Sequence, residues 1–115
     1  MVKRVIVGAH YGLKDWLAQR VTALVMAIYT VLFAAMLTIC TPASFEDWRA
    51  LFKPQWMRLA SLVFLLSLFY HAWIGMRDIL MDYIQSTGIR LGLQIVVALL
   101  LVAYTGWAIQ ILWSI

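Results

Sequence analysis

The chain has 115 residues, of which 65% are hydrophobic and only 12% are charged. Soluble domains usually carry about 25% charged residues, so this composition excludes an ordinary soluble domain and places the chain among membrane proteins. The net charge of +4 does not indicate nucleic-acid binding, because the cations are not gathered on one basic face.

Charged residues are missing from three long stretches, residues 21–40, 59–76 and 91–115. These stretches hold 20, 18 and 25 residues, and a helix needs roughly 20 to cross a bilayer. The sequence therefore predicts an all-α membrane protein with three spanning helices in a single domain, residues 1–115. Strands are disfavoured, since a small membrane barrel would need alternating segments of about 10 residues.

The N-terminal segment, residues 1–15, has two glycines and no strong helical period. We therefore expect a polar lead-in, with the first helix over about 16–40. No small-residue cleavage site follows this helix, which argues against a signal peptide, and the segment lacks an Arg-rich, Ser-rich transit extension, which favours a bacterial chain. Cys40 is the only cysteine, so it cannot form an internal disulfide and is interpreted as a small apolar residue at a helix end.

Two interpretations fit residues 44–53, between the first two spans. Ser44 followed by Asp47 is similar to a capping box, although the box prefers Glu or Gln at the last position. Aromatic and leucine side chains then recur at helical spacing. These features predict a short helix in the outer membrane interface, and a loop with aromatic anchors is the alternative.

The second spanning helix is expected over about 55–82 and the third over about 87–114. Pro54 fits the first turn of the second helix, and Ser86 or Thr87 can cap the third. Small residues occur along all three spans, which allows close helix contact in lipid. Because three helices leave many sides uncovered, we expect helices of a partner chain to pack against them.

The distribution of lysine and arginine predicts the orientation in the membrane. Six of these residues lie in the N-terminal segment and around the turn between the second and third spans, against three in the loop between the first two. Positive charges are enriched on the cytoplasmic side. We therefore expect a cytoplasmic N-terminus and a periplasmic C-terminus.

His71 lies inside the second apolar stretch, in the segment FYHAWIGMRDILMDY, residues 69–83. An ionisable side chain at that depth is costly and suggests a function. Three interpretations are open: it binds a metal or haem iron, it relays protons, or it hydrogen-bonds a neighbouring helix. One histidine cannot supply both axial ligands of a haem, and His10 is far from it in depth, so a bis-histidine haem would need a ligand from another chain.

Further polar candidates lie at the cytoplasmic rim. Helical geometry places Asp78 and Asp82 on the same face as His71. We expect Arg20, at the start of the first helix, to share a membrane level with Asp82 and Tyr83. A guanidinium there could pair with haem propionates, while Tyr83 could donate a hydrogen bond to a quinone and Asp82 could be its acid or relay. Aspartate and tyrosine are also ordinary where a helix leaves the membrane.

Three segments resemble one known family, the small hydrophobic membrane anchor subunits of bacterial succinate dehydrogenase, or complex II. They are DWLAQRVTALVMAIYT at 15–30, HAWIGMRDILMDY at 71–83 and the Arg90-Leu91 start of the third helix. The second segment is the most specific. The resemblance covers nearly the whole chain, including its length and its three predicted spans.

The resemblance implies a role for each candidate residue. His71 would be one axial ligand of a haem b, and a partner anchor subunit would supply the other. Arg20 would face the haem propionates or the quinone pocket. Tyr83 would hydrogen-bond ubiquinone, with Asp82 in its proton route.

The resemblance also implies partners and a location. Flavoprotein and iron–sulfur subunits would dock on the cytoplasmic face of the bacterial inner membrane and carry FAD and iron–sulfur clusters, for which this chain has neither a dinucleotide fingerprint nor a cysteine cluster. The complexes can assemble further as trimers of heterotetramers. The implied function is that of an anchor in electron transfer from succinate to ubiquinone, in the respiratory chain and the tricarboxylic acid cycle.

Two alternatives to this function stay open. One is the anchor of a fumarate reductase, which is the same class of complex working in reverse. The other is a small non-redox membrane accessory subunit in which His71 and the aspartates relay protons.

Overall fold

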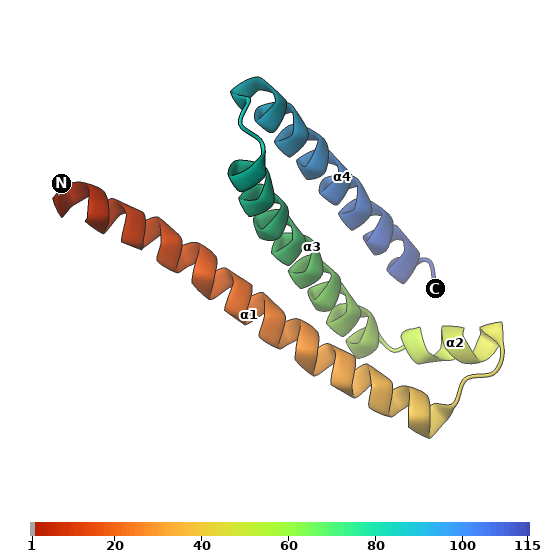
Figure 1. Cartoon of the computed structure of the whole chain (residues 1–115). Helices are drawn as coiled ribbons and strands as arrows, with labels where there is room; N and C mark the ends of the chain where they lie inside the picture. Colours follow the sequence, from red (N-terminus) through yellow and green to blue (C-terminus); the bar gives the residue numbers. More distant parts are fainter. Residues whose placement is uncertain (1) are drawn as a thin grey trace.

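The computed structural model describes the backbone of residues 2–115 and the side chains of residues 12–115. Over these residues the chain consists of helices without strands (Figure 1): α1 (Val2–Cys40), α2 (Phe45–Phe52), α3 (Gln55–Tyr83) and α4 (Thr87–Trp113). Gly12–Cys40 of α1, all of α3 and all of α4 are long and apolar enough to cross a membrane. This confirms the predicted all-α fold with three spanning helices.

The first helix begins earlier than the sequence suggested. Its backbone is helical from Val2, whereas we expected a lead-in up to about residue 15. The expectation depended on two glycines, but a glycine inside a helix costs only about 1 kcal/mol, and an established helix extends more easily than it starts.

The segment between the first two spans is a helix, α2. Its N-cap, Ser44, accepts a hydrogen bond from the backbone N–H of Asp47 at 3.3 Å. The Asp47 carboxylate accepts one from the backbone N–H of Ala43 at 3.1 Å, one residue before the position that a capping box uses. These reciprocal bonds fix the start of α2. Pro54 is then the N-cap of α3 rather than part of its first turn.

A short turn joins α3 and α4. Ile84 is in an extended conformation (φ −100°, ψ 114°) that ends α3. Ser86 occupies the N-cap position of α4, but its side chain makes no capping hydrogen bond there. Its backbone carbonyl accepts a hydrogen bond from the N–H of Arg90 at 2.9 Å, so backbone geometry alone defines the start of this helix.

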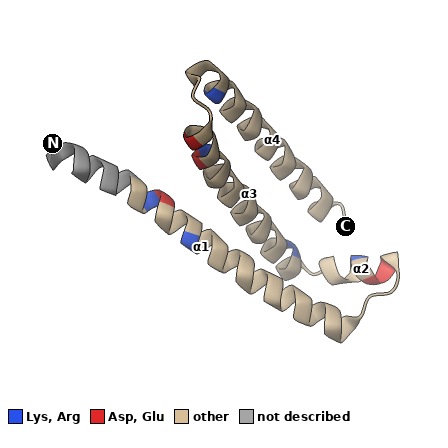
Figure 2. Ribbon diagram, viewed as in Figure 1, with Lys and Arg blue, Asp and Glu red and all other residues tan. Residues whose placement is uncertain are grey.

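The central helix is α3. It packs against α1 on one side and against α4 on another, and Figure 1 shows it between the two. The charged side chains gather toward the two ends of this arrangement and leave its middle uncharged (Figure 2). An uncharged middle band flanked by charged ends is the distribution that a bilayer requires.

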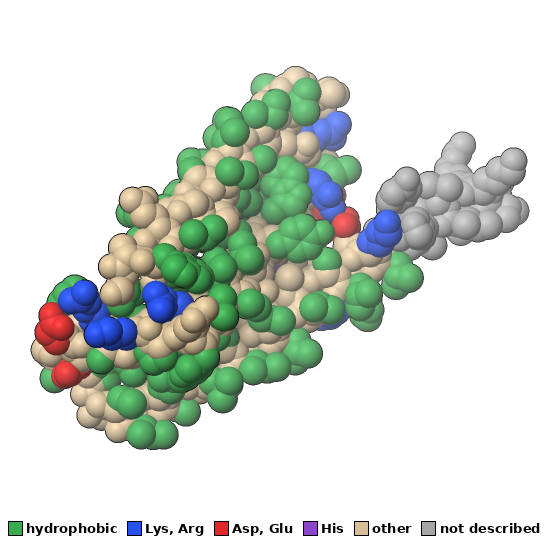
Figure 3. Space-filling view, turned by 180° about the vertical axis from the view of Figure 1, so that it is seen from behind, with side chains coloured by type: hydrophobic (Ala, Val, Ile, Leu, Met, Phe, Trp, Pro, Cys, Tyr) green, Lys and Arg blue, Asp and Glu red, His purple; other side chains and the backbone are tan. Residues whose placement is uncertain are grey.

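Few side chains are fully buried. Among residues 12–115, the part whose side chains are described, the buried apolar residues are Leu51, Met57, Ile74, Leu80 and Leu112. The accessible surface of 8481 Å² is about a third larger than the roughly 6,400 Å² expected for a soluble monomer of this mass. Apolar side chains are spread over the face drawn in Figure 3, which suits a protein covered by lipid and partner helices rather than water.

The glycines of the spans do not bring the helices of this chain together. A Cβ atom added at Gly75, Gly88, Gly92 or Gly106 would meet no atom within 4 Å. The α1–α3 and α3–α4 contacts therefore do not depend on these glycines, and their open faces keep room for another chain.

Candidate functional site

Polar side chains join α1 to α3 at successive depths. Three residues of α1, spaced seven apart, contact polar residues of α3. The pairs are Asp15 with Arg77, Thr22 with His71, and Tyr29 with Ser61. As the residue number increases along α1, the residue number of the contacted α3 residue decreases, so the two helices run antiparallel. A seven-residue spacing keeps the three α1 side chains on one face of their helix, toward α3.

His71 is half-buried and is held by α1 through one ring nitrogen. Its Nδ1 lies 2.9 Å from the hydroxyl oxygen of Thr22, and Thr22 is only 8% exposed. This is the interhelical hydrogen bond that was one of the three interpretations of the histidine. Among the described residues the other nitrogen, Nε2, has no hydrogen-bond partner, which leaves it able to ligate. His10 lies outside the residues whose side chains are described.

His71 lines a cleft of about 580 Å³ between α1 and α3. This volume is within the range of small-molecule sites, about 300–1,000 Å³. The polar part of its lining includes Gln19, Arg20 and Asp78, and Trp16 contributes apolar surface. The structure therefore brings Arg20 and His71, predicted from distant parts of the sequence, into one site.

Arg20 is oriented by an aromatic ring of its own helix. Its guanidinium carbon lies 5.4 Å from the ring centroid of Trp16, one turn earlier. A cation–π contact of this kind places the guanidinium over the ring face and keeps its N–H donors available. Arg20 can thus present a positive charge to an anionic group at the cleft.

The side-chain amide of Gln19, another polar group of the cleft, was not among the candidates predicted from the sequence. The side-chain Oε1 of Gln19 is buried and has no hydrogen-bond partner among the described residues. An unsatisfied buried acceptor costs about 1–3 kcal/mol, and a polar ligand in the cleft would satisfy this amide. Its only signal in the sequence was its position beside Arg20, and Thr22 was equally inconspicuous because threonine is common in spanning helices.

Asp82 and Tyr83 lie outside this cleft, in the last turn of α3. Both are exposed, Tyr83 at 78%. Asp78 does line the cleft together with His71, as their shared helical face predicted. The helix thus presents two separate polar regions, the cleft and the exposed end.

Arg20 does not share a level with Asp82, contrary to our expectation. The antiparallel register puts Asp15 beside Arg77 and Thr22 beside His71. Arg20 is therefore near the level of His71, while Asp82 is roughly 16 Å of helical rise away from that histidine. The expectation took Arg20 as close to the start of the first helix, whereas α1 already includes Asp15, and it is Asp15 that lies beside Arg77 near the end of α3.

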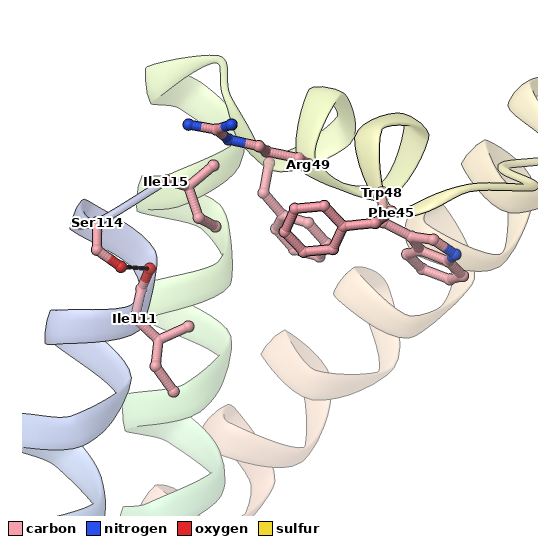
Figure 4. A pocket seen from close by; sticks show the side chains of 7 residues that line it. Phe45, Trp48, Arg49, Ile111, Ser114 and Ile115 are labelled. Carbon is pink, nitrogen blue, oxygen red and sulfur yellow. Dashed lines mark hydrogen bonds between the residues drawn. The ribbon is translucent and has the colours of Figure 1, made fainter.

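Another groove lies at the opposite end of the molecule, between α2 and the end of α4 (Figure 4). It measures about 400 Å³, and aromatic side chains from α2, including Phe45 and Trp48, form much of its lining. Its polar groups are Arg49 and the Ser114 hydroxyl, which donates to the carbonyl of Ile111 at 3.0 Å. Among its described lining residues there is no histidine or carboxylate, so we place the candidate site at His71.

Comparison with known proteins identifies the family of this chain. Residues 3–106 match the model of a family described as "Succinate dehydrogenase/Fumarate reductase transmembrane subunit", a range that includes all four residues predicted as sites. A protein of Coxiella burnetii described as "Succinate dehydrogenase hydrophobic membrane anchor subunit" is 44% identical over 102 residues, which cover 89% of this chain and 89% of that protein. The chain is a multi-pass membrane anchor subunit that belongs to the succinate dehydrogenase/fumarate reductase transmembrane family.

Proposed function

We propose that this chain anchors a succinate:ubiquinone oxidoreductase in the bacterial inner membrane, supplying one axial ligand of a haem b and part of the ubiquinone site. The observation that carries the proposal is the cleft in which a histidine and an arginine converge between α1 and α3. A histidine held through Nδ1 with Nε2 unused is the arrangement typical of a metal ligand.

The residues of the cleft fit a haem. His71 would hold the iron through Nε2, and Arg20 would pair with a propionate. A haem, when bound, supplies one-electron transfer. Because α1 and α3 form only part of the enclosure, the second axial ligand and the other walls would come from the partner anchor subunit.

The exposed end of α3 supports a quinone site. Tyr83 and Asp82 are not covered by this chain, so they are accessible to a ligand bound between it and its partner subunits. The Tyr83 hydroxyl would donate a hydrogen bond to a quinone carbonyl oxygen. The Asp82 carboxyl would pass one proton to that oxygen, and the second carbonyl oxygen would take another, as two electrons reduce the quinone to the quinol.

The remaining redox chemistry would take place in partner subunits. The flavoprotein, which carries FAD, would oxidise succinate to fumarate, and the iron–sulfur subunit would pass the two electrons to the quinone. Both would dock on the cytoplasmic face, and the complexes would assemble as trimers of heterotetramers. The share of this chain is to hold the assembly in the membrane and to form one wall of each site.

The family description also covers fumarate reductases, and the same geometry would serve an anchor working in that direction. The name of the Coxiella burnetii relative favours succinate oxidation. The ratio of succinate:quinone to quinol:fumarate activity of the purified complex separates the two functions.

The proposal is tested by reduced-minus-oxidised visible spectra of the complex purified through this chain. We expect a low-spin b-type spectrum with flavin in the same peak, and His71→Ala should abolish or alter the spectrum while flavin is retained. His10→Ala, which changes the other histidine, is the matched control and should leave the spectrum unchanged.

Two outcomes would contradict the proposal. A wild-type complex that contains flavin without haem would make the chain a haem-free anchor, and only the quinone role would stand. A preparation with neither haem nor flavin would return His71 to packing or proton relay in an accessory subunit.

A further inference from the structure

The proton of the Thr22 hydroxyl can be placed from its contacts. Its oxygen lies 2.7 Å from the backbone carbonyl oxygen of Ala18 and 3.2 Å from that of Gln19. A carbonyl oxygen can only accept a hydrogen bond, and two oxygens at the shorter of these distances without a proton between them would repel. The single hydroxyl proton of Thr22 is therefore directed to its own helix.

This placement fixes which partner donates between Thr22 and His71. With its proton used, the Thr22 oxygen can only accept, so Nδ1 of the histidine must carry the proton across the 2.9 Å contact. A neutral imidazole has one N–H and one lone pair. The lone pair therefore lies on Nε2, the atom that a haem iron would need.

We propose that Thr22 is a positioning residue that holds His71 in the Nδ1-protonated tautomer, with the Nε2 lone pair presented for ligation. This inference deepens the proposed haem role of His71 and depends on it. A carbonyl or carboxylate usually performs this task for a metal-binding histidine. Here the Thr22 hydroxyl performs it, because that hydroxyl already donates its own proton to a backbone carbonyl of α1.

The surroundings make the Thr22 oxygen a fixed acceptor. The side chain is buried, so water does not compete for the histidine proton. Its branched Cβ restricts χ1, and the bond to Ala18 locks the hydroxyl further. The ion pair of Asp15 with Arg77, about two turns earlier along α1, joins this helix to α3 on the same face.

Loss of the hydroxyl would change the ligand and not only the packing. When the Thr22 oxygen accepts a hydrogen bond from Nδ1–H, the imidazole donates more electron density through Nε2. A stronger electron donor stabilises ferric iron relative to ferrous iron. We expect Thr22→Val, which keeps the shape and removes the acceptor, to shift the haem midpoint potential upward and to weaken haem retention about 10–100-fold. Thr22→Ser, which keeps a hydroxyl, should leave both the midpoint potential and haem retention close to their wild-type values.

The experiment compares these two variants in the whole complex, by potentiometric titration of the haem and by haem-to-flavin ratio after a detergent challenge. Tyr29→Phe is the matched control, because it removes another α1–α3 hydrogen bond, the 2.6 Å contact with Ser61, away from the cleft. We expect it to leave the potential unchanged. A potential equally shifted in Thr22→Val and Tyr29→Phe, or shifted in neither, would overturn the positioning role.

The tautomer is measured separately from any bound haem. Nitrogen-15 NMR is measured on the full chain labelled at histidine, with His10→Gln so that His71 is its one histidine. The spectrum should show Nδ1 protonated when Thr22 is present and a mixture of the two tautomers in Thr22→Val.

A spectrum with Nε2 protonated when Thr22 is present would overturn this inference, while a haem spectrum sensitive to His71→Ala would keep the proposed function. A haem spectrum insensitive to His71→Ala would instead overturn the proposed haem role, and the positioning role with it. If the Thr22→Val variant does not assemble, the nitrogen-15 spectrum of the chain with Thr22 and the Thr22→Ser variant still test the positioning role.

Discussion

A polar side chain inside a spanning helix must find its partner within protein, because lipid offers none. Three other threonines of the spans solve this locally. The hydroxyls of Thr30, Thr38 and Thr105 donate to carbonyls of their own helices at 2.7–2.8 Å. Thr22 does the same and additionally contacts a second helix. That second contact is what distinguishes a threonine with a role at the site from one that only satisfies its own hydroxyl.

At the exposed end of α3, Tyr83→Phe removes one hydrogen-bond donor. We expect kcat/KM for quinone reduction to fall roughly tenfold, since a net hydrogen bond contributes about 0.5–1.5 kcal/mol, while the haem spectrum stays unchanged. Tyr70→Phe makes the same chemical change on the α4-facing side of α3, where Tyr70 lines an apolar groove, and should have no effect. Steady-state kinetics with a soluble quinone measure kcat/KM. An unchanged kcat/KM in Tyr83→Phe would show that Tyr83 does not belong to the quinone site.

The charge of Arg20 leads to a second prediction at this scale. A cation beside the haem propionates favours the reduced, more negative haem, so Arg20→Gln should lower its midpoint potential. Arg58→Gln is the control, because Arg58 makes a similar cation–π contact, 5.9 Å from the Trp113 ring centroid, at the other end of α3. A potential that moved equally in both variants, or in neither, would place Arg20 away from the haem.

At the scale of the elements, the contact between α1 and α3 decides the site. The cleft exists because the two helices meet in one antiparallel register, with polar pairs at three depths. Sliding one helix by a single turn, about 5.4 Å, would separate Thr22 from His71. The neighbouring helix α4 packs on α3 and contributes no residue to this cleft.

The ion pair between Asp15 and Arg77 is expected to select this register. Its Arg77 and Asp15 side chains are 31% and 42% exposed, so the pair should contribute only about 0.2–1 kcal/mol. Asp15→Arg or Arg77→Asp alone places like charges together and should reduce the yield of flavin-containing complex extracted from membranes. The exchange of both charges should restore it. Single variants that assemble as well as the wild type would show that the apolar contacts suffice.

The whole molecule is an open arrangement that other chains and lipid must complete. α3 carries α1 and α4 on its sides, and large apolar side chains stay exposed along all three long helices. The open faces at the glycines and the partly enclosed cleft both favour partner helices. A haem shared between two anchor subunits would bind them together through the iron.

The orientation of the whole chain is predicted by its cations. Six lysines and arginines on the N-terminal side, against three on the other, place the α3–α4 turn in the cytoplasm and the C-terminus in the periplasm. Alkaline phosphatase fused after Ile115 should be active, whereas the same enzyme fused after Gln85 should be inactive. The reverse pattern would invert the proposed docking face.

The amino-acid sequence alone determined the class of this protein, because hydropathy and charge act locally along the chain. Uncharged stretches specify the three spans, and a histidine inside one of them suggests a function because an ionisable side chain is costly in lipid. Choosing between helix and loop for residues 44–53 needed the cap geometry of Ser44 and Asp47. The tertiary structure alone decided that Thr22 meets His71, that Gln19 and Arg20 line its cleft, and that Tyr83 does not. Thr22 and His71 are 49 positions apart in the sequence, and the register that brings them together depends on the packing of two whole helices.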